Sequence, residues 1–367
     1  MLIEALQVIK NNVTESGIAA ATSGPVSNGH REYLHVWPRD AILCALEWID
    51  YEPQKAYDSI EAVCKLQLND AGLFYQRYEF DGKPDEFGWT NSHGNYQIDQ
   101  DALMLVGASK LPKNKLNDKL NQTIYLHYLN LIKYIEKENT ATDVWEQKRG
   151  YFFYTTSALI WGLECAEVLF ENEKLSPNHF KIKNKLIESL TGFYNKPMNA
   201  YVKSPEEPIM DLEVILGLVI LNYTSVAKNN EKFLLNQLNS LFVFENELMV
   251  KVGSGAAPIR YDGDFWNGEI VGASGIGRPW PMGTCLLSSA YSLAAMNSKK
   301  MNSVNLYNYC INKSKINLEL VKRIPHANKF VEQIDKNEFV PANGPVGLSW
   351  AASEYLRAIK LHQEAKK

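Results

Sequence analysis

Apolar residues recur along most of this chain at the three- and four-residue spacing that is typical of amphipathic helices. The pattern predicts twelve helices, near residues 1–12, 39–50, 52–68, 97–109, 117–138, 154–172, 176–195, 208–223, 228–243, 281–297, 301–322 and 349–364. Alternation typical of strands is confined to Gly72–Tyr78 and Glu247–Val252, which we expect to form short hairpins between helices. The chain is therefore predicted to be all-α.

The connections between the predicted helices alternate in length. Long connections, mostly rich in Gly, Pro, Trp and Asn, occupy residues 13–38, 69–96, 139–153, 196–207, 244–280 and 323–348, and those between them are short. Antiparallel helices joined in this way predict a ring of helical hairpins, an (α/α)6 barrel, with the long functional loops at one end. An α-solenoid is the alternative, but no repeat of constant length is visible. No low-complexity linker divides the chain, so we expect residues 1–367 to form one domain.

Composition and charge narrow the classes of function. The net charge of −4 and the pI near 6 argue against a protein built to bind nucleic acid or an anionic membrane. No apolar run approaches the roughly 18 residues of a membrane span. The 8 Trp and 19 Tyr residues offer flat faces that either stack on sugar rings or serve packing.

The five cysteines are scattered and lack CxxC spacing, and four of them lie in apolar, helix-like runs. We therefore expect buried free thiols and a reducing compartment. The first ten residues resemble an amphipathic helix rather than a signal sequence, because Glu4 interrupts their apolar stretch. A cytoplasmic protein is expected. A monomer is favoured, although the sequence does not define the oligomeric state.

Polar clusters fall in or beside the long connections. In the first, Pro38 suits the first turn of a helix, and Arg39 and Asp40 follow it after Trp37. Arg39 and Asp40 either belong to a capped helix start, with Arg39 paired to a carboxylate, or point toward sugar hydroxyls. The residues alone leave both interpretations open.

Two further clusters combine aromatic with polar groups, as a sugar site requires. One holds His93, Gln97 and Asp99 just before a predicted helix, where a capped helix start is the alternative. The other holds Arg260, Tyr261 and Trp280, which offer a charged donor and a stacking surface or else cover a helix end. No segment shows metal-ligand spacing such as HExxH, so neither a metal nor a cofactor is expected.

Two glutamates lie in long connections next to bulky apolar residues: Glu146, between Trp145 and Gln147, and Glu332, after Val331. Hydrolysis of a glycosidic bond needs one carboxyl group that keeps its proton and one that loses it. The aromatic neighbour of Glu146 favours the protonated form, which suits a general acid. Glu332 would be the ionised base, roughly 6.5–9.5 Å away in an inverting enzyme. An exposed loop glutamate and a turn before the last helix are the alternatives.

Together these segments resemble glycoside hydrolase family fifteen, the glucoamylases and their relatives, in the family's order over roughly residues 13–360. The likeness lies in Trp37-Pro38-Arg39-Asp40, Gly94 to Asp99, Asp143-Val144-Trp145-Glu146, Arg260-Tyr261, Gly277 to Trp280, Glu332-Gln333 and Leu348-Ser349-Trp350. The resemblance implies an (α/α)6 barrel that releases β-D-glucose from the non-reducing ends of α-glucans by inversion.

The resemblance also implies roles for single residues. Glu146 would be the general acid and Glu332 the general base; Arg39, Asp40 and Arg260 would hold the terminal glucose, and Trp145 and Trp280 would shape its pocket. Gln147 stands where many members have a second glutamate, and His93 where fungal enzymes have tryptophan. Both departures concern the leaving-group subsite.

Several alternatives stay open within and beyond this family. We expect neither a starch-binding module nor the N-terminal β-sandwich of many prokaryotic members, so short soluble oligosaccharides fit better than starch granules. Relatives that cleave α-1,6 glucans or trehalose are not separated by the sequence. A catalytically silent glucan-binding domain is the alternative from another class, and the presence of both Glu146 and Glu332 argues against it.

Overall fold

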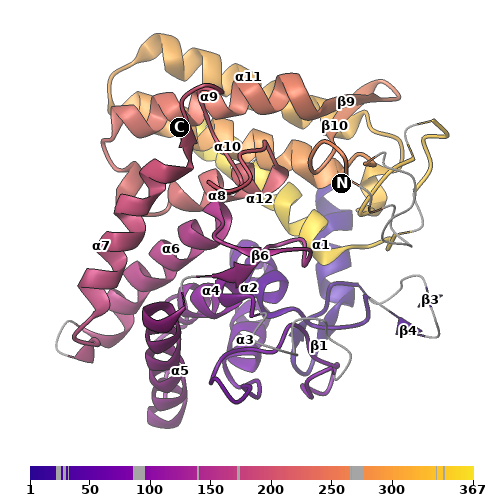
Figure 1. The fold of residues 1–367 in the computed structure, drawn as a ribbon. Coiled ribbons are helices and arrows are strands. Elements are labelled where there is room, and N and C mark those ends of the chain that lie inside the picture. The colour runs from indigo at the N-terminus through magenta and orange to yellow at the C-terminus, as the bar shows by residue number, and fades with distance from the viewer. Residues whose placement is uncertain are drawn as a thin grey trace. The chain divides into compact units, whose positions relative to one another are not determined.

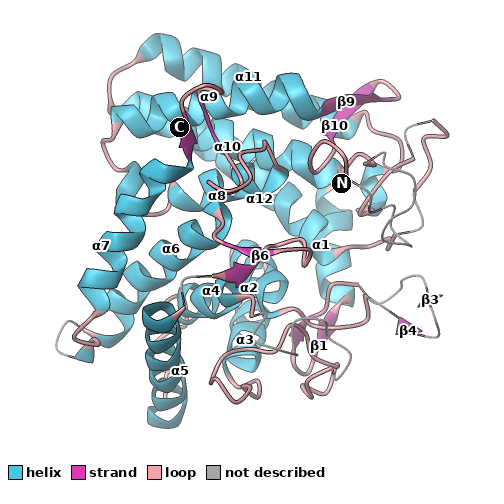
Figure 2. Ribbon diagram, viewed as in Figure 1, coloured by secondary structure: helices cyan, strands magenta, loops and turns pink. Residues whose placement is uncertain are grey.

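The computed structural model describes residues 1–21, 26–27, 30–31, 33–85, 96–138, 140–171, 174–264, 266, 277–335, 337–341 and 344–367, and helices dominate them (Figures 1 and 2). All twelve predicted helices are confirmed, with ends shifted by a few residues. They are α1 (Leu2–Asn11), α2 (Pro38–Trp48), α3 (Pro53–Cys64), α4 (Ile98–Ala108), α5 (Asp118–Lys137), α6 (Phe153–Phe170), α7 (His179–Ser189), α8 (Leu212–Leu221), α9 (Glu231–Leu248), α10 (Pro281–Lys300), α11 (Val304–Lys322) and α12 (Ser349–Lys366).

Local chemistry fixes where many of these helices begin. Helices α2, α3 and α10 start at proline, whose fixed φ and missing N–H suit the first helical position. Helices α5, α8 and α9 start after a residue whose side chain accepts a hydrogen bond from a backbone N–H of the first turn: Asn117, Asp211 and Asn230.

Short antiparallel hairpins occupy several of the long connections. Their strands are β1 (Val13–Thr14) with β2 (Gly17–Ile18), β3 (Val26–Ser27) with β4 (His30–Arg31), β5 (Ala141–Thr142) with β6 (Arg149–Gly150), β7 (Tyr194–Asn195) with β8 (Ala200–Tyr201), and β9 (Met249–Val252) with β10 (Gly255–Pro258). The hairpin predicted at Glu247–Val252 is confirmed as β9 and β10. Gly72–Tyr78 makes only isolated bridges, one of them from Tyr78 to Pro84, which has no N–H with which to extend a ladder.

Burial alternates from helix to helix. Every residue of α4 and of α8 is buried, and α8 is an almost unbroken run of Leu, Ile and Val. The odd-numbered helices, such as α5 and α11, bury one face and expose the other. The connection from each even-numbered helix to the next is short, and the connection back is long, as the sequence predicts.

The chain divides into two compact units, each of which has its own packed helices. One unit comprises residues 1–11, 21–33 and 192–367, and in it α10 packs against α8, α9, α11 and α12. The other comprises residues 12–20 and 34–191, and in it α4 packs against α2, α3, α5 and α6. The expectation of a single domain stays a prediction.

The cysteine prediction is confirmed. Cys44, Cys64, Cys165, Cys285 and Cys310 are all buried and free. Among the residues that the structure describes, no helix is both long enough and apolar enough to cross a bilayer.

Candidate active site

Glu146 is presented by a tight hairpin that Asp143 organises. Strands β5 and β6 pair on either side of this turn. The buried Asp143 carboxylate accepts hydrogen bonds from the backbone N–H groups of Gln147 at 2.7 Å and Lys148 at 3.2 Å. The Glu146 N–H donates to the Asp143 carbonyl at 3.0 Å, and Glu146 itself has a φ of +62°. A left-handed glutamate costs backbone energy, so the surrounding bonds hold it in place.

The Glu146 carboxyl group is desolvated but keeps a hydrogen-bond donor. Trp37 Nε1 donates to Glu146 Oε1 at 3.0 Å. Burial raises the pKa of Glu146 above its ordinary value, although the Arg39 charge and a hydrogen bond from Gln76 act in the opposite direction. This shift has the direction that the sequence predicts for a general acid.

Arg39 lies at the centre of a buried ion-pair network. Its guanidinium donates to Asp40 at 3.0 Å and, from α2 to α4, to Asp99 at 3.3 Å. Tyr154 on α6 donates to the same Asp99 oxygen at 3.1 Å. Burial raises the pKa of Asp99 to about 6, and that of Asp40 is raised for the same reason, while Arg39 counteracts both shifts. One of the two interpretations of Arg39 was that it pairs with a carboxylate at a helix start, and this pairing is present.

The other candidates of this region, which we call the Glu146 cluster, lie on the same unit. Gln97 precedes α4 and donates from Nε2 to the Asp143 carbonyl at 3.2 Å, so it braces the hairpin. Trp145 is buried and Gln147 half-buried. His93 lies outside the described residues. The structure thus brings together Trp37, Arg39, Asp40, Gln97, Asp99, Trp145, Glu146 and Gln147.

Glu332 lies on the other unit and is almost completely buried, with 4% of its surface exposed. The Tyr33 hydroxyl donates to Glu332 Oε1 at 2.6 Å. Glu332 Oε2 is buried and accepts no hydrogen bond from the described residues. A Cβ on Gly344 would lie 2.6 Å from this oxygen, so only glycine fits there without displacement. Tyr33 thus holds one oxygen of the carboxyl group, and the Trp266 side chain is near enough to act against the rise in its pKa.

Burial raises the pKa of Glu332 to about 7, although the Tyr33 hydrogen bond and the Arg260 charge lower it. We expected an ionised base, and burial instead opposes the ionisation of this carboxyl group. The same group can therefore take up and release a proton in the neutral range.

Arg260 is fixed by the buried Asp264 in a bidentate pair, with Nε–Oδ2 at 2.9 Å and Nη2–Oδ1 at 2.6 Å. Its guanidinium lies 5.2 Å from the centre of the Trp280 ring and 5.6 Å from that of Tyr261. The Ile334 N–H donates to the Pro279 carbonyl at 3.0 Å, which joins the Trp280 segment to that of Glu332. We call Tyr33, Arg260, Tyr261, Asp264, Trp280 and Glu332 the Glu332 cluster.

Sequence reasoning missed the groups that hold the candidates in place. Tyr33 lies 299 positions from Glu332, and nothing in the local pattern links the two. Asp264 and Tyr154 likewise act through tertiary contacts. Asp143 alone had a local signal, since an aspartate at the start of a short loop commonly binds the backbone N–H groups that follow.

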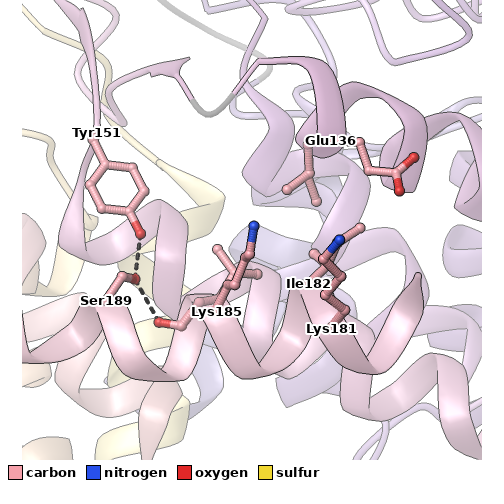
Figure 3. A pocket seen from close by; sticks show the side chains of 8 residues that line it. Glu136, Tyr151, Lys181, Ile182, Lys185 and Ser189 are labelled. Carbon is pink, nitrogen blue, oxygen red and sulfur yellow. Dashed lines mark hydrogen bonds between the residues drawn. The ribbon is translucent and has the colours of Figure 1, made fainter.

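A separate cavity of about 360 Å³ lies between α5 and α7 (Figure 3). It is lined by Ile135, Glu136, Tyr151, Lys181, Ile182, Lys185, Leu186 and Ser189. Tyr151 donates to Ser189, which donates to the Leu186 carbonyl. None of the candidate residues lines this cavity, so it is not the predicted site.

Comparison with known proteins gives the family of this chain. An uncharacterized glycosyl hydrolase of Methanocaldococcus jannaschii is 27% identical over 359 residues, which cover 93% of this chain and 52% of that protein. A glucoamylase of Clostridium sp. is 24% identical over 388 residues, which cover 96% of this chain and 51% of that protein. The chain therefore spans about half the length of these curated relatives.

Solved structures show the fold. The glucoamylase from Saccharomycopsis fibuligera matches with a TM-score of 0.76 at 18% identity, over 100% of this chain and 94% of that one. A bacterial glucoamylase complexed with acarbose matches with a TM-score of 0.72 at 19% identity, over 98% and 55% of the two chains. The predicted all-α, (α/α)6 fold is thereby confirmed. The model of the glycosyl hydrolases family 15 matches residues 3–320, so this chain belongs to that family.

Proposed function

We propose that this protein is an inverting, exo-acting hydrolase that releases β-D-glucose from the non-reducing ends of α-glucans or short α-gluco-oligosaccharides. One observation carries the proposal. Glu146 and Glu332 are both desolvated, and neither forms an ion pair with a Lys or Arg in the part of the chain that the structure describes. Asp40, Asp99 and Asp264, in contrast, are paired with arginine. Burying a carboxyl group without a paired cation costs folding free energy. That the fold keeps two such groups favours a role for them in proton transfer.

In the proposed mechanism, Glu146 donates its proton to the glycosidic oxygen as the bond from the anomeric carbon to that oxygen breaks. Glu332 accepts a proton from the attacking water, whose oxygen forms the new bond to the anomeric carbon with inversion. The Trp37 hydrogen bond would stabilise the Glu146 carboxylate that results, and Tyr33 would orient Glu332.

The paired arginines are suited to binding. Arg39 and Arg260 are each fixed by a buried carboxylate, so the orientation of each guanidinium group is set before a ligand binds. We propose that they, with Asp40, bind the hydroxyl groups of the terminal glucose, and that Trp145 and Trp280 shape the pocket around it. Gln147 would belong to the leaving-group subsite, together with His93.

The first experiment replaces each carboxyl group with its amide. Glu146→Gln and Glu332→Gln should each lower the turnover number by roughly 10²–10⁴-fold, the usual contribution of general acid–base groups, with folding intact. Glu188→Gln, on the exposed side of α7, is the matched control and should act as the wild type does. Full activity of either active-site variant on the best substrate would refute the assignment.

The substrate and the stereochemistry of the reaction are both determined with the wild-type protein. Glucose release is measured on maltose, maltotriose, isomaltose, trehalose and soluble starch, because the sequence does not separate this protein from relatives that cleave α-1,6 glucans or trehalose. NMR of fresh product should show β-glucose first, and initial α-glucose would exclude inversion. No release from any of these substrates would instead support a glucan-binding domain.

A further inference from the structure

We propose that His35, Glu79 and Asp85 form a binding site for one divalent transition-metal ion of the Zn²⁺ class, next to the Glu146 cluster. The sequence shows no metal motif, because the histidine lies more than forty positions before the two carboxylates. The fold brings them together, and none of the three has a role in the function proposed above.

The ligand atoms already have the spacing that a small ion requires. His35 Nε2 lies 3.4 Å from Glu79 Oε1 and 3.7 Å from Asp85 Oδ2. The three ligand atoms all lie within 4.8 Å of one another. Ligands about 2.1 Å from a tetrahedral Zn²⁺ are about 3.4 Å apart, so the ion fits with small adjustments of the side chains.

Backbone hydrogen bonds fix the two carboxylates before any ion binds. Glu79 and Asp85 flank a reverse turn in which the Glu79 N–H donates to the Lys83 carbonyl at 2.8 Å. Ser16 Oγ donates to the Glu79 carbonyl at 3.0 Å, and the Asp85 N–H donates to the Arg77 carbonyl at 3.1 Å. Such pre-organisation reduces the entropy lost on binding.

One of the two carboxylates carries a charge that no cation compensates. Arg77 Nε donates to Asp85 Oδ2 at 2.5 Å, so this ion pair orients the Asp85 carboxylate and neutralises its charge. The Glu79 side chain pairs with no Lys or Arg of the described chain, so its charge is not compensated. The Asp85 side chain is 5% exposed, whereas that of Glu79 is 52% exposed, so an ion can enter beside Glu79 and keep a water ligand.

The ligand types select the metal. One imidazole nitrogen with two carboxylate oxygens suits Zn²⁺ or Co²⁺, whereas Mg²⁺ and Ca²⁺ prefer oxygen alone. The site also adjoins the candidate acid. The His35 ring lies edge-on to Trp37, with 5.9 Å between ring centres, and Trp37 donates to Glu146. An ion bound here would therefore sit against the group that supports Glu146.

The test is calorimetric titration of the full chain, without an affinity tag, with ZnCl₂. We expect one Zn²⁺ per chain and at least tenfold weaker binding in Glu79→Gln, whose exposed side chain can change without disturbing the core. Glu52→Gln is the matched control, since the Glu52 side chain is 45% exposed on the same unit, and it should bind as the wild type does. His35→Gln should likewise lose affinity.

Cobalt gives a second readout that does not depend on activity. Co²⁺ should add visible absorption bands and quench part of the tryptophan fluorescence through Trp37, and both effects should weaken in Glu79→Gln. Absence of stoichiometric Zn²⁺ uptake would overturn the proposal. So would unchanged affinity in both Glu79→Gln and His35→Gln, or Mg²⁺ binding as tight as Zn²⁺ binding.

Discussion

Glu332 keeps a carboxyl group in surroundings that oppose its ionisation, and this has a cost in stability. Its pKa is about 7 in the folded chain, against an ordinary value of 4.5. Between these values the unfolded chain loses the proton while the folded chain retains it. Folding stability is therefore lost as the pH rises through this window, by up to roughly 3 kcal/mol above it.

This predicts that Glu332→Gln is more stable than the wild type at pH 8 and close to it at pH 4. The amide cannot ionise, and its carbonyl oxygen can still accept the Tyr33 hydrogen bond. Melting temperatures of both proteins from pH 4 to 8 provide the measurement. A stability difference that stays constant over this range would contradict the raised pKa.

Single residues show where sequence reasoning reaches its limit. Trp145 beside Glu146 indicated a desolvated carboxyl group, and the structure agrees in the direction of the pKa shift. One donor that contacts Glu146 is Trp37, however, 109 positions away. The spacing of residues along a chain indicates only which groups are neighbours in sequence. A hydrogen-bond partner such as Trp37 depends on how separate segments pack together.

Most of the helices were predictable because they repeat an apolar pattern over about three turns or more. The two-residue strands were not, since a pair of residues cannot display an alternation. The β5–β6 hairpin that presents Glu146 belongs to this second class. The element that positions the candidate acid is thus one that the hydrophobic pattern does not reveal.

Helices α4 and α6 approach closely at Gly162, and the same two helices carry the hydrogen-bonded pair Asp99 and Tyr154. A Cβ at Gly162 would lie 2.5 Å from the Ala102 carbonyl oxygen and 2.8 Å from its Cα. Gly162→Ala should therefore force the two helices apart and lower the free energy of unfolding by about 1–3 kcal/mol.

Urea denaturation measures this effect, with Gly192→Ala as the control. A Cβ at Gly192 meets no atom within 4 Å, so that variant should unfold near the wild-type midpoint. Equal midpoints for the two variants would show that α4 and α6 can separate without cost.

The fold of the complete chain followed from the regular alternation of short and long connections, which is a property of all its helices together. The likeness to solved glucoamylases confirms it. Linkage preference did not follow, because it depends on the side chains of the leaving-group subsite rather than on helix order.

The free thiols give a prediction for the chain as a whole. Burial raises the pKa of Cys64 and of Cys310 to about 12, which suppresses the reactive thiolate. A thiol reagent should therefore react slowly with the native protein and titrate five thiols after denaturation. A reducing agent should leave the melting temperature unchanged, and a rise in the number of thiols on reduction would reveal a disulfide.

The close approach of Gly344 to Glu332 suggests one way in which a descendant of this chain could lose the activity proposed for it. A single methyl group at position 344 would lie against Glu332 Oε2 and displace it. One nucleotide change could thus move the Glu332 carboxyl group while both glutamates remain in the gene. Position 344 is therefore a place to look when a descendant of this chain is found to bind glucans without cleaving them.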